Sequence, residues 1–260
     1  MLRPRIIPCL LIQDGGLVKT VKFKDPKYVG DPINAVKIFN EKEADELIVI
    51  DIDATAHGVE PNYTQIAKLA AECRMPLCYG GGIRTAAQAK KIIQLGVEKV
   101  AISSAALENP QLVTQIAEEI GSQSVVVVLD HKSRLLSKHQ EVWTHNGTRN
   151  TKRNVLEVAQ ELEKLGAGEI VLNSIENDGK MKGYDLDLAT KLRAAVHIPI
   201  TILGGGGSLE DMASVVKACG VVGVAAGSFF VFKGAYRAVL ISYPSAQQKD
   251  DTIYSALRAR

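Results

Sequence analysis

Eight short aliphatic runs alternate with amphipathic stretches along nearly the whole chain. The runs predict strands at Arg5–Ile12, Glu46–Ile52, Leu77–Tyr79, Lys99–Ile102, Val125–Leu129, Glu169–Asn173, Ile200–Leu203 and Val221–Ala226. The stretches between them predict helices at Pro32–Lys42, Tyr63–Cys73, Thr85–Leu95, Pro110–Ile120, Val155–Leu165, Leu186–Ala195, Leu209–Ala218 and Ala235–Tyr243. Most strands are apolar on both faces, as in a buried parallel sheet. Eight such units in 260 residues match the α/β class and a (β/α)8 TIM barrel, with a doubly wound open sheet as the alternative.

The two halves of the sequence repeat each other, which favours the barrel. Residues 44–50 resemble residues 167–173, Gly80–Gly82 resembles Gly204–Gly207, and Ser104 corresponds to Ser228. Matching positions stay 123 or 124 residues apart. A chance similarity would not keep one register over so many strands. We therefore expect a single domain, residues 1–260, made of half-barrels that span roughly 1–120 and 121–245.

Composition excludes several classes of protein. With 46% hydrophobic residues, 23% charged residues and a net charge of +2, the chain has no global field to attract nucleic acid. No apolar run approaches the roughly 20 residues of a membrane span, and residues 1–8 lack the apolar stretch of a signal peptide. The four cysteines form no Cys-x-x-Cys pair and are expected to be free thiols. We expect a soluble cytoplasmic protein without membrane or nucleic-acid partners.

Two glycine clusters, Gly80–Gly82 and Gly204–Gly207, follow the third and seventh predicted strands. The loops after the neighbouring strands carry Ser103-Ser104 and Gly227-Ser228. Glycine lets backbone N–H groups converge on an anion, and the start of a following helix adds positive potential. A single cluster can equally be a tight turn, whereas two clusters related by the repeat favour two phosphate sites. The sequence therefore predicts a substrate with two phosphates, or a nucleotide-sugar diphosphate, at the barrel mouth.

The first strand–helix loop is long and basic. It contains Asp14-Gly15-Gly16, followed by four lysines at positions 19, 22, 24 and 27. A glycine-hinged loop at a barrel mouth is typical of a lid, and its lysines would favour an anionic substrate. A solvated surface loop is the alternative.

Carboxylates at the ends of predicted strands are the candidate acid–base groups: Asp51, Asp53, Asp130 and Asp178. Asp130 ends the apolar run 125–129, where burial should raise its pKa toward the range that a general acid or base requires. An Asp at a strand end can also cap the following loop. We predict that Asp130 takes part in catalysis or contacts substrate.

Four charged residues stand at the opposite ends of the predicted strands: Arg5, Glu46, Lys99 and Glu169. Two cations and two anions at one depth of a barrel predict a closed ring of ion pairs, whose simplest role is stability. Glu46 and Asp51 fall on opposite faces of an ideal strand, so one of them needs a β-bulge to point inward. The five histidines show no metal-ligand spacing and no Gly-x-Ser-x-Gly elbow exists, so we expect no metal and no cofactor.

The chain resembles the cyclase subunit of imidazole glycerol phosphate synthase, the barrel half of a glutamine amidotransferase in histidine biosynthesis. The resemblance covers nearly the whole sequence and rests on motifs spread along it. These are Arg5-Ile-Ile-Pro-Cys-Leu10 with Asp14-Gly15 and Lys19, Asp45-Glu-Leu47, Gly80-Gly-Gly-Ile83, Glu108-Asn-Pro110, Gly121-Ser-Gln123 with Asp130, Gly166-Ala-Gly-Glu169, and Ser174-Ile175 with Asp178-Gly179 and Gly183-Tyr-Asp185.

The resemblance implies a partner and a path for ammonia. The barrel of this family docks through its N-terminal face onto a class I glutaminase subunit, as a heterodimer. Ammonia enters through a gate that maps to the charged ring of Arg5, Glu46, Lys99 and Glu169, and crosses the barrel to a phosphorylated substrate. We expect substrate or phosphate contacts at Lys19, Asp51, Gly81, Gly82, Ser103, Ser104, Asn173, Asp178, Gly204, Gly205, Ala226, Gly227 and Ser228.

One departure bears on the reaction. The family uses two aspartates as acid and base, and the second is Asp130, but the first position is Leu11. An isobutyl group cannot transfer protons, which puts cyclase activity in question. Ser103-Ser104 and Thr20 also differ from the usual histidine-pathway pattern. The chain looks like a paralogue group that accompanies a separate sugar amidotransferase in surface-polysaccharide (lipopolysaccharide) synthesis, where ammonia converts an acetamido sugar to an acetamidino sugar.

Three hypotheses therefore remain. The first is an ammonia-channelling barrel of an amidino-sugar pathway, with lyase- or cyclase-type chemistry and a third protein as a further partner. The second is the true cyclase subunit of histidine biosynthesis. The third is a non-catalytic barrel that binds phosphosugars without a glutaminase. Leu11 favours the first over the second, and the charged ring favours both over the third.

Overall fold

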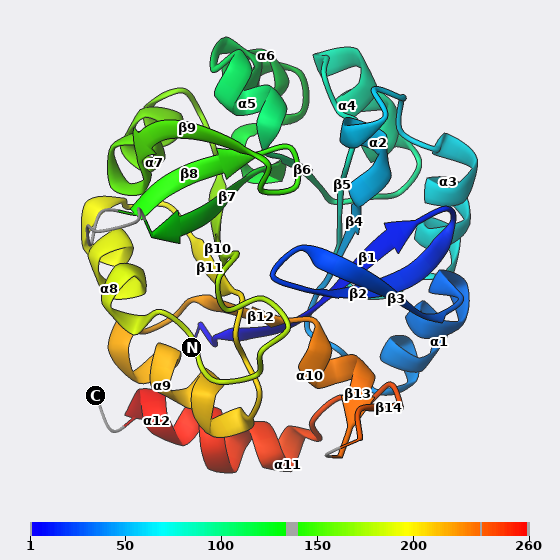
Figure 1. The fold of residues 1–260 in the computed structure, drawn as a ribbon, viewed down its shortest axis with the longest axis vertical. Helices are drawn as coiled ribbons and strands as arrows, with labels where there is room; N and C mark the ends of the chain where they lie inside the picture. The colour runs from blue at the N-terminus through cyan, green and yellow to red at the C-terminus, as the bar shows by residue number, and fades with distance from the viewer. Residues whose placement is uncertain (1, 134–139, 235, 259–260) are drawn as a thin grey trace.

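The computed structural model describes residues 2–133, 140–234 and 236–258. Eight parallel strands close into a barrel with helices outside it, so the predicted (β/α)8 barrel is confirmed (Figure 1). The barrel strands are β1 (Arg5–Gln13), β4 (Leu47–Asp51), β5 (Leu77–Gly80), β6 (Lys99–Ile102), β7 (Val125–Ser133), β10 (Glu169–Ser174), β11 (Ile200–Leu203) and β12 (Gly223–Ala226). They pair in chain order, and β12 returns to β1.

The strands bury both faces, which explains their apolar composition. Alternate residues point into the barrel and form one small cluster of side chains: Ile7, Cys9, Ile48, Cys78, Ala101, Val126, Val171 and Ala225. The intervening residues pack outward against the helices in a second, larger cluster. Such two-sided burial is expected of a parallel sheet wrapped by helices.

The outer helices are α1 (Pro32–Glu41), α3 (Tyr63–Glu72), α4 (Ala86–Gln94), α6 (Gln111–Ile120), α7 (Val155–Lys164), α8 (Leu186–Ala195) and α9 (Leu209–Cys219). Several of them are capped by the side chain just before their first residue, as at Asp31, Thr85 and Asn154. Short helices α2 (Ile52–Ala56), α5 (Ser104–Glu108) and α10 (Ser228–Val231) start directly at strand ends, and η1 (Ser122–Ser124) precedes β7. Among the described helices, none has the length and apolar character needed to cross a membrane.

The eighth helix was predicted at Ala235–Tyr243, and this prediction is wrong over the part that the structure describes. Ala235 lies outside the described residues, but β13 (Phe232–Lys233) and β14 (Ala238–Val239) form a short antiparallel hairpin there. Gly234 takes a positive φ of 72° and helps to turn the chain between these strands. A C-terminal segment of α11 (Ala246–Gln248), η2 (Lys249–Tyr254) and α12 (Ser255–Arg258) packs beside α9 in place of the predicted helix.

Two hairpins stand over the C-terminal ends of the barrel strands. The long first loop, for which we expected a lid or a solvated surface loop, contains the hairpin of β2 (Gly16–Val21) and β3 (Lys24–Gly30). A second hairpin, β8 (Gln140–Thr144) and β9 (Arg149–Asn154), extends β7 in the other half of the barrel. In Figure 1 the turns of both hairpins point toward the barrel axis. They border the mouth in which the predicted substrate contacts lie.

Candidate functional site

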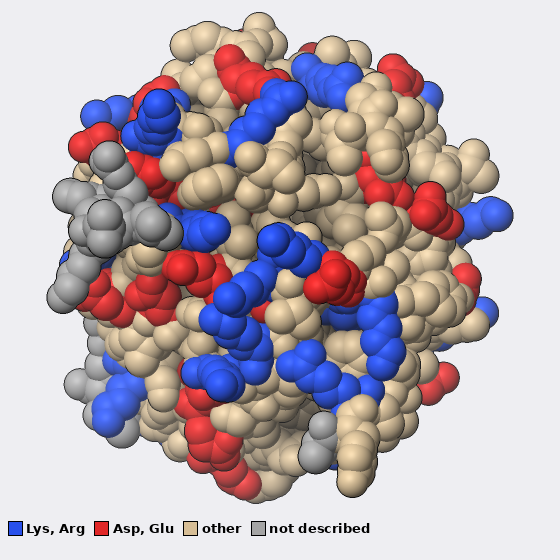
Figure 2. Space-filling view, viewed as in Figure 1, with Lys and Arg blue, Asp and Glu red and all other residues tan. Residues whose placement is uncertain are grey.

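A pocket of about 230 Å³ lies at the C-terminal ends of the strands. The space-filling view shows the hollow near the centre of this face, with Lys and Arg gathered over the loop between β10 and α8 (Figure 2). Leu11, Asp130 and every residue predicted to contact substrate line this one pocket. The structure therefore brings together residues spread from position 11 to position 228, and their binding roles remain predictions.

The first glycine cluster forms one wall. Gly81 and Gly82 have φ of 118° and 72°, and a Cβ on Gly81 would collide with the backbone of Asp51. Ser103, in the loop after β6, has a buried hydroxyl with no hydrogen-bond partner in the described structure. Ser104 accepts the backbone N–H of His145 at 3.0 Å, which leaves its own hydroxyl hydrogen free to donate. Uncompensated buried hydroxyls are costly, so this wall is suited to an anionic ligand.

The second glycine cluster forms the opposite wall in the same way. Gly204 and Gly205 have φ of 93° and 114°, and the hydroxyl of Ser228, at the start of α10, is buried without a partner in the described structure. The ammonium group of Lys19 occupies the space that a Cβ on Gly227 would need. This wall therefore combines backbone, a free hydroxyl and a cation.

Asp130 lies between the two walls. Its side chain is partly buried, and this burial, with the nearby negative charge of Asp178, raises its pKa to about 7. Asn173 donates to its Oδ1 at 2.8 Å and counteracts part of that rise. A carboxyl group with this pKa can exchange a proton near neutral pH. Leu11, from β1, lines the same pocket and packs with the apolar barrel interior.

The three other predicted carboxylates have local structural roles as well. Asp51 ends β4, and its Oδ1 accepts the N–H groups of Asp53 and Ala54 at the start of α2. Burial nevertheless raises the pKa of Asp51. Asp53 accepts the backbone N–H of Asp14 at 2.8 Å and so supports the first hairpin. Asp178 is likewise bonded to this hairpin, through Thr20.

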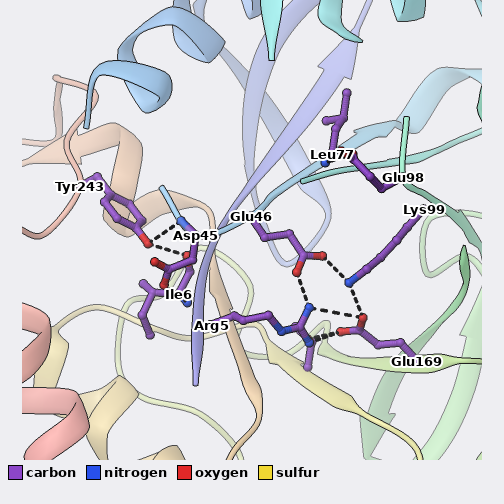
Figure 3. Close-up of polar contacts among 10 residues, drawn as sticks. Arg5, Ile6, Asp45, Glu46, Leu77, Glu98, Lys99, Glu169 and Tyr243 are labelled. Carbon is purple, nitrogen blue, oxygen red and sulfur yellow. Dashed lines mark hydrogen bonds and ion pairs between the residues drawn. The ribbon is translucent and has the colours of Figure 1, made fainter. Parts of the chain in front are cut away.

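The charged ring lies at the opposite end of the barrel, where Arg5, Lys99, Glu46 and Glu169 pair alternately (Figure 3). Lys99 Nζ lies 2.8 Å from a carboxylate oxygen of each glutamate, Arg5 Nη2 lies 2.7 Å from Glu169, and Arg5 Nη1 also contacts Glu46. Burial alone would raise the pKa of Glu169, but Arg5 and Lys99 together lower it to about 2. Glu169 therefore carries a negative charge at neutral pH and faces the two cations across the N-terminal end of the barrel.

The β-bulge expected in the second barrel strand is absent from β4. This strand begins at Leu47 and pairs with both neighbours without a register shift. Glu46 lies just before the strand, where side chains need not alternate between the two faces of the sheet, so its side chain can reach the ring. Asp51, at the far end, turns to cap α2.

Residues that the sequence reasoning missed come from the second hairpin. His145 and Asn146 line the pocket with φ of 52° and 54°, and Asn146 donates to the carbonyl of Ile52 at 2.8 Å. The Asn146-Gly147 pair is a common signal for a hairpin turn and could have revealed it. No group of three or more His, Cys, Asp or Glu side chains suited to a metal ion occurs among the described residues.

Comparison with known proteins gives a consistent result. The family model "Histidine biosynthesis protein" matches residues 5–237. "Putative imidazole glycerol phosphate synthase subunit hisF3" of Vibrio vulnificus strain YJ016 is 58% identical over 249 residues, 96% of each chain. "Putative imidazole glycerol phosphate synthase subunit HisF" of Leptospira borgpetersenii is 54% identical, over 96% of this chain and 98% of that protein. "Imidazole glycerol phosphate synthase subunit HisF" of Exiguobacterium sibiricum is 40% identical, over 88% of this chain and 91% of that protein.

Proposed function

The chain belongs to the histidine biosynthesis protein family, among relatives of the cyclase subunit of imidazole glycerol phosphate synthase, and we propose that it is the ammonia-using barrel subunit of a glutamine amidotransferase. The observation that carries this proposal is the placement of two polar sites at opposite ends of one barrel. The charged ring lies across the N-terminal end, and the pocket with Asp130 opens at the C-terminal end. The barrel interior between them is lined by small and aliphatic side chains.

This arrangement supports transfer of ammonia through the barrel. Ionisable side chains are expensive to bury, so four of them at one end of a hydrophobic interior favour a role beyond stability. A class I glutaminase docked on the N-terminal face would release ammonia at the ring. Neutral ammonia could then cross the apolar interior, whereas the ammonium ion would be excluded by the cost of burial.

The mouth would hold the acceptor by its phosphates. Glycine backbone and the hydroxyls of Ser103, Ser104 and Ser228 are suited to two phosphate groups on opposite walls. Asp130, with a pKa near 7, would move protons at the centre. The names of the relatives favour imidazole ring formation in histidine biosynthesis as the reaction, with this chain as the cyclase subunit.

Leu11 favours a second candidate. A side chain without an ionisable group leaves Asp130 without the acidic partner that the family resemblance implies. Ammonia would then go to an acceptor that needs less proton transfer, as in conversion of an acetamido sugar to an acetamidino sugar with a separate sugar amidotransferase. Relatives at 53–58% identity also stand apart from those at 40–43%.

The test is to reconstitute the chain with a class I glutaminase and compare glutamine with ammonium as the nitrogen source. Lys99→Ala opens the ring and should lower glutamine-dependent turnover while ammonium-dependent turnover persists. Lys90→Ala, which removes a surface ion pair with Glu119, is the matched control and should change neither. Full activity at low ammonium without any partner, or equal loss with both nitrogen sources in Lys99→Ala, would contradict the proposal.

A further inference from the structure

Asp178 joins two segments of the mouth that are far apart in the sequence. It lies in the loop between β10 and α8, and its Oδ2 accepts the hydroxyl of Thr20 at 2.8 Å and the backbone N–H of Phe23 at 3.1 Å. Its carbonyl oxygen accepts the N–H of Lys22 at 3.1 Å. One residue of this loop therefore binds the turn of the β2–β3 hairpin at three points.

The receiving loop is itself held in place. Arg237 donates to the carbonyl of Gly179 at 2.6 Å, from the segment that connects β13 to β14. The base of the hairpin has separate anchors, since Gln65 donates to the carbonyl of Gly15 at 2.9 Å and Asp53 binds Asp14. The bonds to Asp178 therefore act on the tip of the hairpin rather than on its base.

Thr20 is adjacent to the one hairpin lysine that is buried in the mouth. Lys19 and Thr20 are each only 5% exposed, and the register of β2 with β3 shifts between positions 19 and 21. Lys19 Nζ lies 3.3 Å from the carbonyl of Cys9, the one hydrogen bond it makes to the described residues, and beside Gly227. A flexible lysine with so few bonds depends on its backbone for its place in the pocket.

We propose that Thr20 is a positioning residue, whose hydroxyl holds the hairpin tip on Asp178 and thereby keeps Lys19 inside the pocket. A hydrogen bond from a hydroxyl to a carboxylate is stronger than one between two neutral groups. Glycine or alanine at position 20 could not make it. The value of Lys19 to catalysis rests on the proposed function, but its placement does not.

The experiment measures acetylation of individual lysines by acetic anhydride, read by mass spectrometry, on the full chain without substrate. Thr20→Val keeps the shape of the side chain and removes the donor. The rate of Lys19 acetylation and the rate of amide hydrogen exchange in residues 16–30 should each rise roughly tenfold, because the loss of one hydrogen bond to a charged group has an effect of about this size. Thr20→Ser retains the donor and should return both rates to those of the wild type. Lys22, already exposed, serves as the internal standard.

Thr114→Val is the matched control, because it removes a threonine hydrogen bond of 2.9 Å to the carbonyl of Leu165, away from the mouth. An unchanged Lys19 rate in folded Thr20→Val, no rescue by Thr20→Ser, or an equal rise in Thr114→Val would each overturn the proposal. Should Thr20→Val not fold, Asp178→Asn weakens the same bond and must also expose Lys19. Protection of wild-type Lys19 by inorganic phosphate tests the proposed function separately, since the effect of Thr20→Val is expected with or without it.

Discussion

Replacing Glu169 by glutamine should reveal the charged ring as a source of stability that depends on pH. The side chain of Glu169 is 6% exposed, and the paired cations lower the pKa of its carboxyl group from 4.5 to about 2. This difference corresponds to roughly 3 kcal/mol of folding free energy. Because the folded pKa is depressed, the stabilisation is present above pH 4.5 and is lost as the pH falls toward 2. Roughly 1 kcal/mol of this stabilisation should be gone by pH 3.5.

The assay is urea unfolding of the wild type and of Glu169→Gln from pH 7 to pH 3.5, followed by circular dichroism and by the fluorescence of the single Trp. The variant should have the lower free energy of unfolding at pH 7, and its difference from the wild type should narrow by roughly 1 kcal/mol at pH 3.5. Glu119→Gln is the control, because it removes the anion of a surface ion pair with Lys90. Its free energy of unfolding should differ from that of the wild type by only about 0–1 kcal/mol at each pH. If the difference in free energy of unfolding between Glu169→Gln and the wild type does not change with pH, the argument that the ring holds this carboxylate ionised is refuted.

Three further changes test the mouth. Asp130→Asn removes a carboxyl group whose pKa is raised from 3.8 to about 7. The free energy of unfolding should therefore rise at pH 8, by up to roughly 4 kcal/mol, and change little at pH 4. Thermal unfolding at the two pH values checks this, and an equal change in melting temperature at both would count against it. Leu11→Asp should raise the rate at which imidazole glycerol phosphate forms with saturating ammonium, by part of the ~10²–10⁴-fold that general acid–base catalysis contributes. Circular dichroism must first show that the variant is folded. No increase in a folded variant would argue that the wild type does not lack an acid at position 11. Gly227→Ala puts a Cβ where the Lys19 ammonium lies, so acetylation of Lys19 should become faster, and an unchanged rate would show that the mouth adapts without moving it.

The barrel could be predicted because local signals agree with the whole fold. The fourth and seventh barrel strands, Lys99–Ile102 and Ile200–Leu203, have the bounds that their aliphatic composition predicts. The glycine clusters and the charged ring could also be placed, because parallel strands bring their equivalent ends to the same end of a barrel.

The contacts that complete the mouth depend on tertiary structure, which the strand–helix pattern does not encode. The β8–β9 hairpin carries a turn signal at Asn146-Gly147, but the eightfold pattern has no place for an extra hairpin. The prediction of the eighth helix was wrong for a related reason. Tyr243, expected in its last turn, instead donates its hydroxyl to the carbonyl of Ile6 at 2.8 Å, and its ring packs against Phe39 and Phe230.

The most direct test of the central claim is turnover of the histidine-pathway intermediate by the isolated chain with saturating ammonium, measured as formation of imidazole glycerol phosphate. The mouth with Asp130 at its centre predicts turnover that Asp130→Asn lowers by ~10²–10⁴-fold, while binding of inorganic phosphate is retained. Equal turnover by the wild type and Asp130→Asn would contradict the assignment of this pocket as the reaction site. No turnover by either protein, with phosphate still bound, would contradict the histidine-pathway reaction and favour the acceptor that Leu11 suggests.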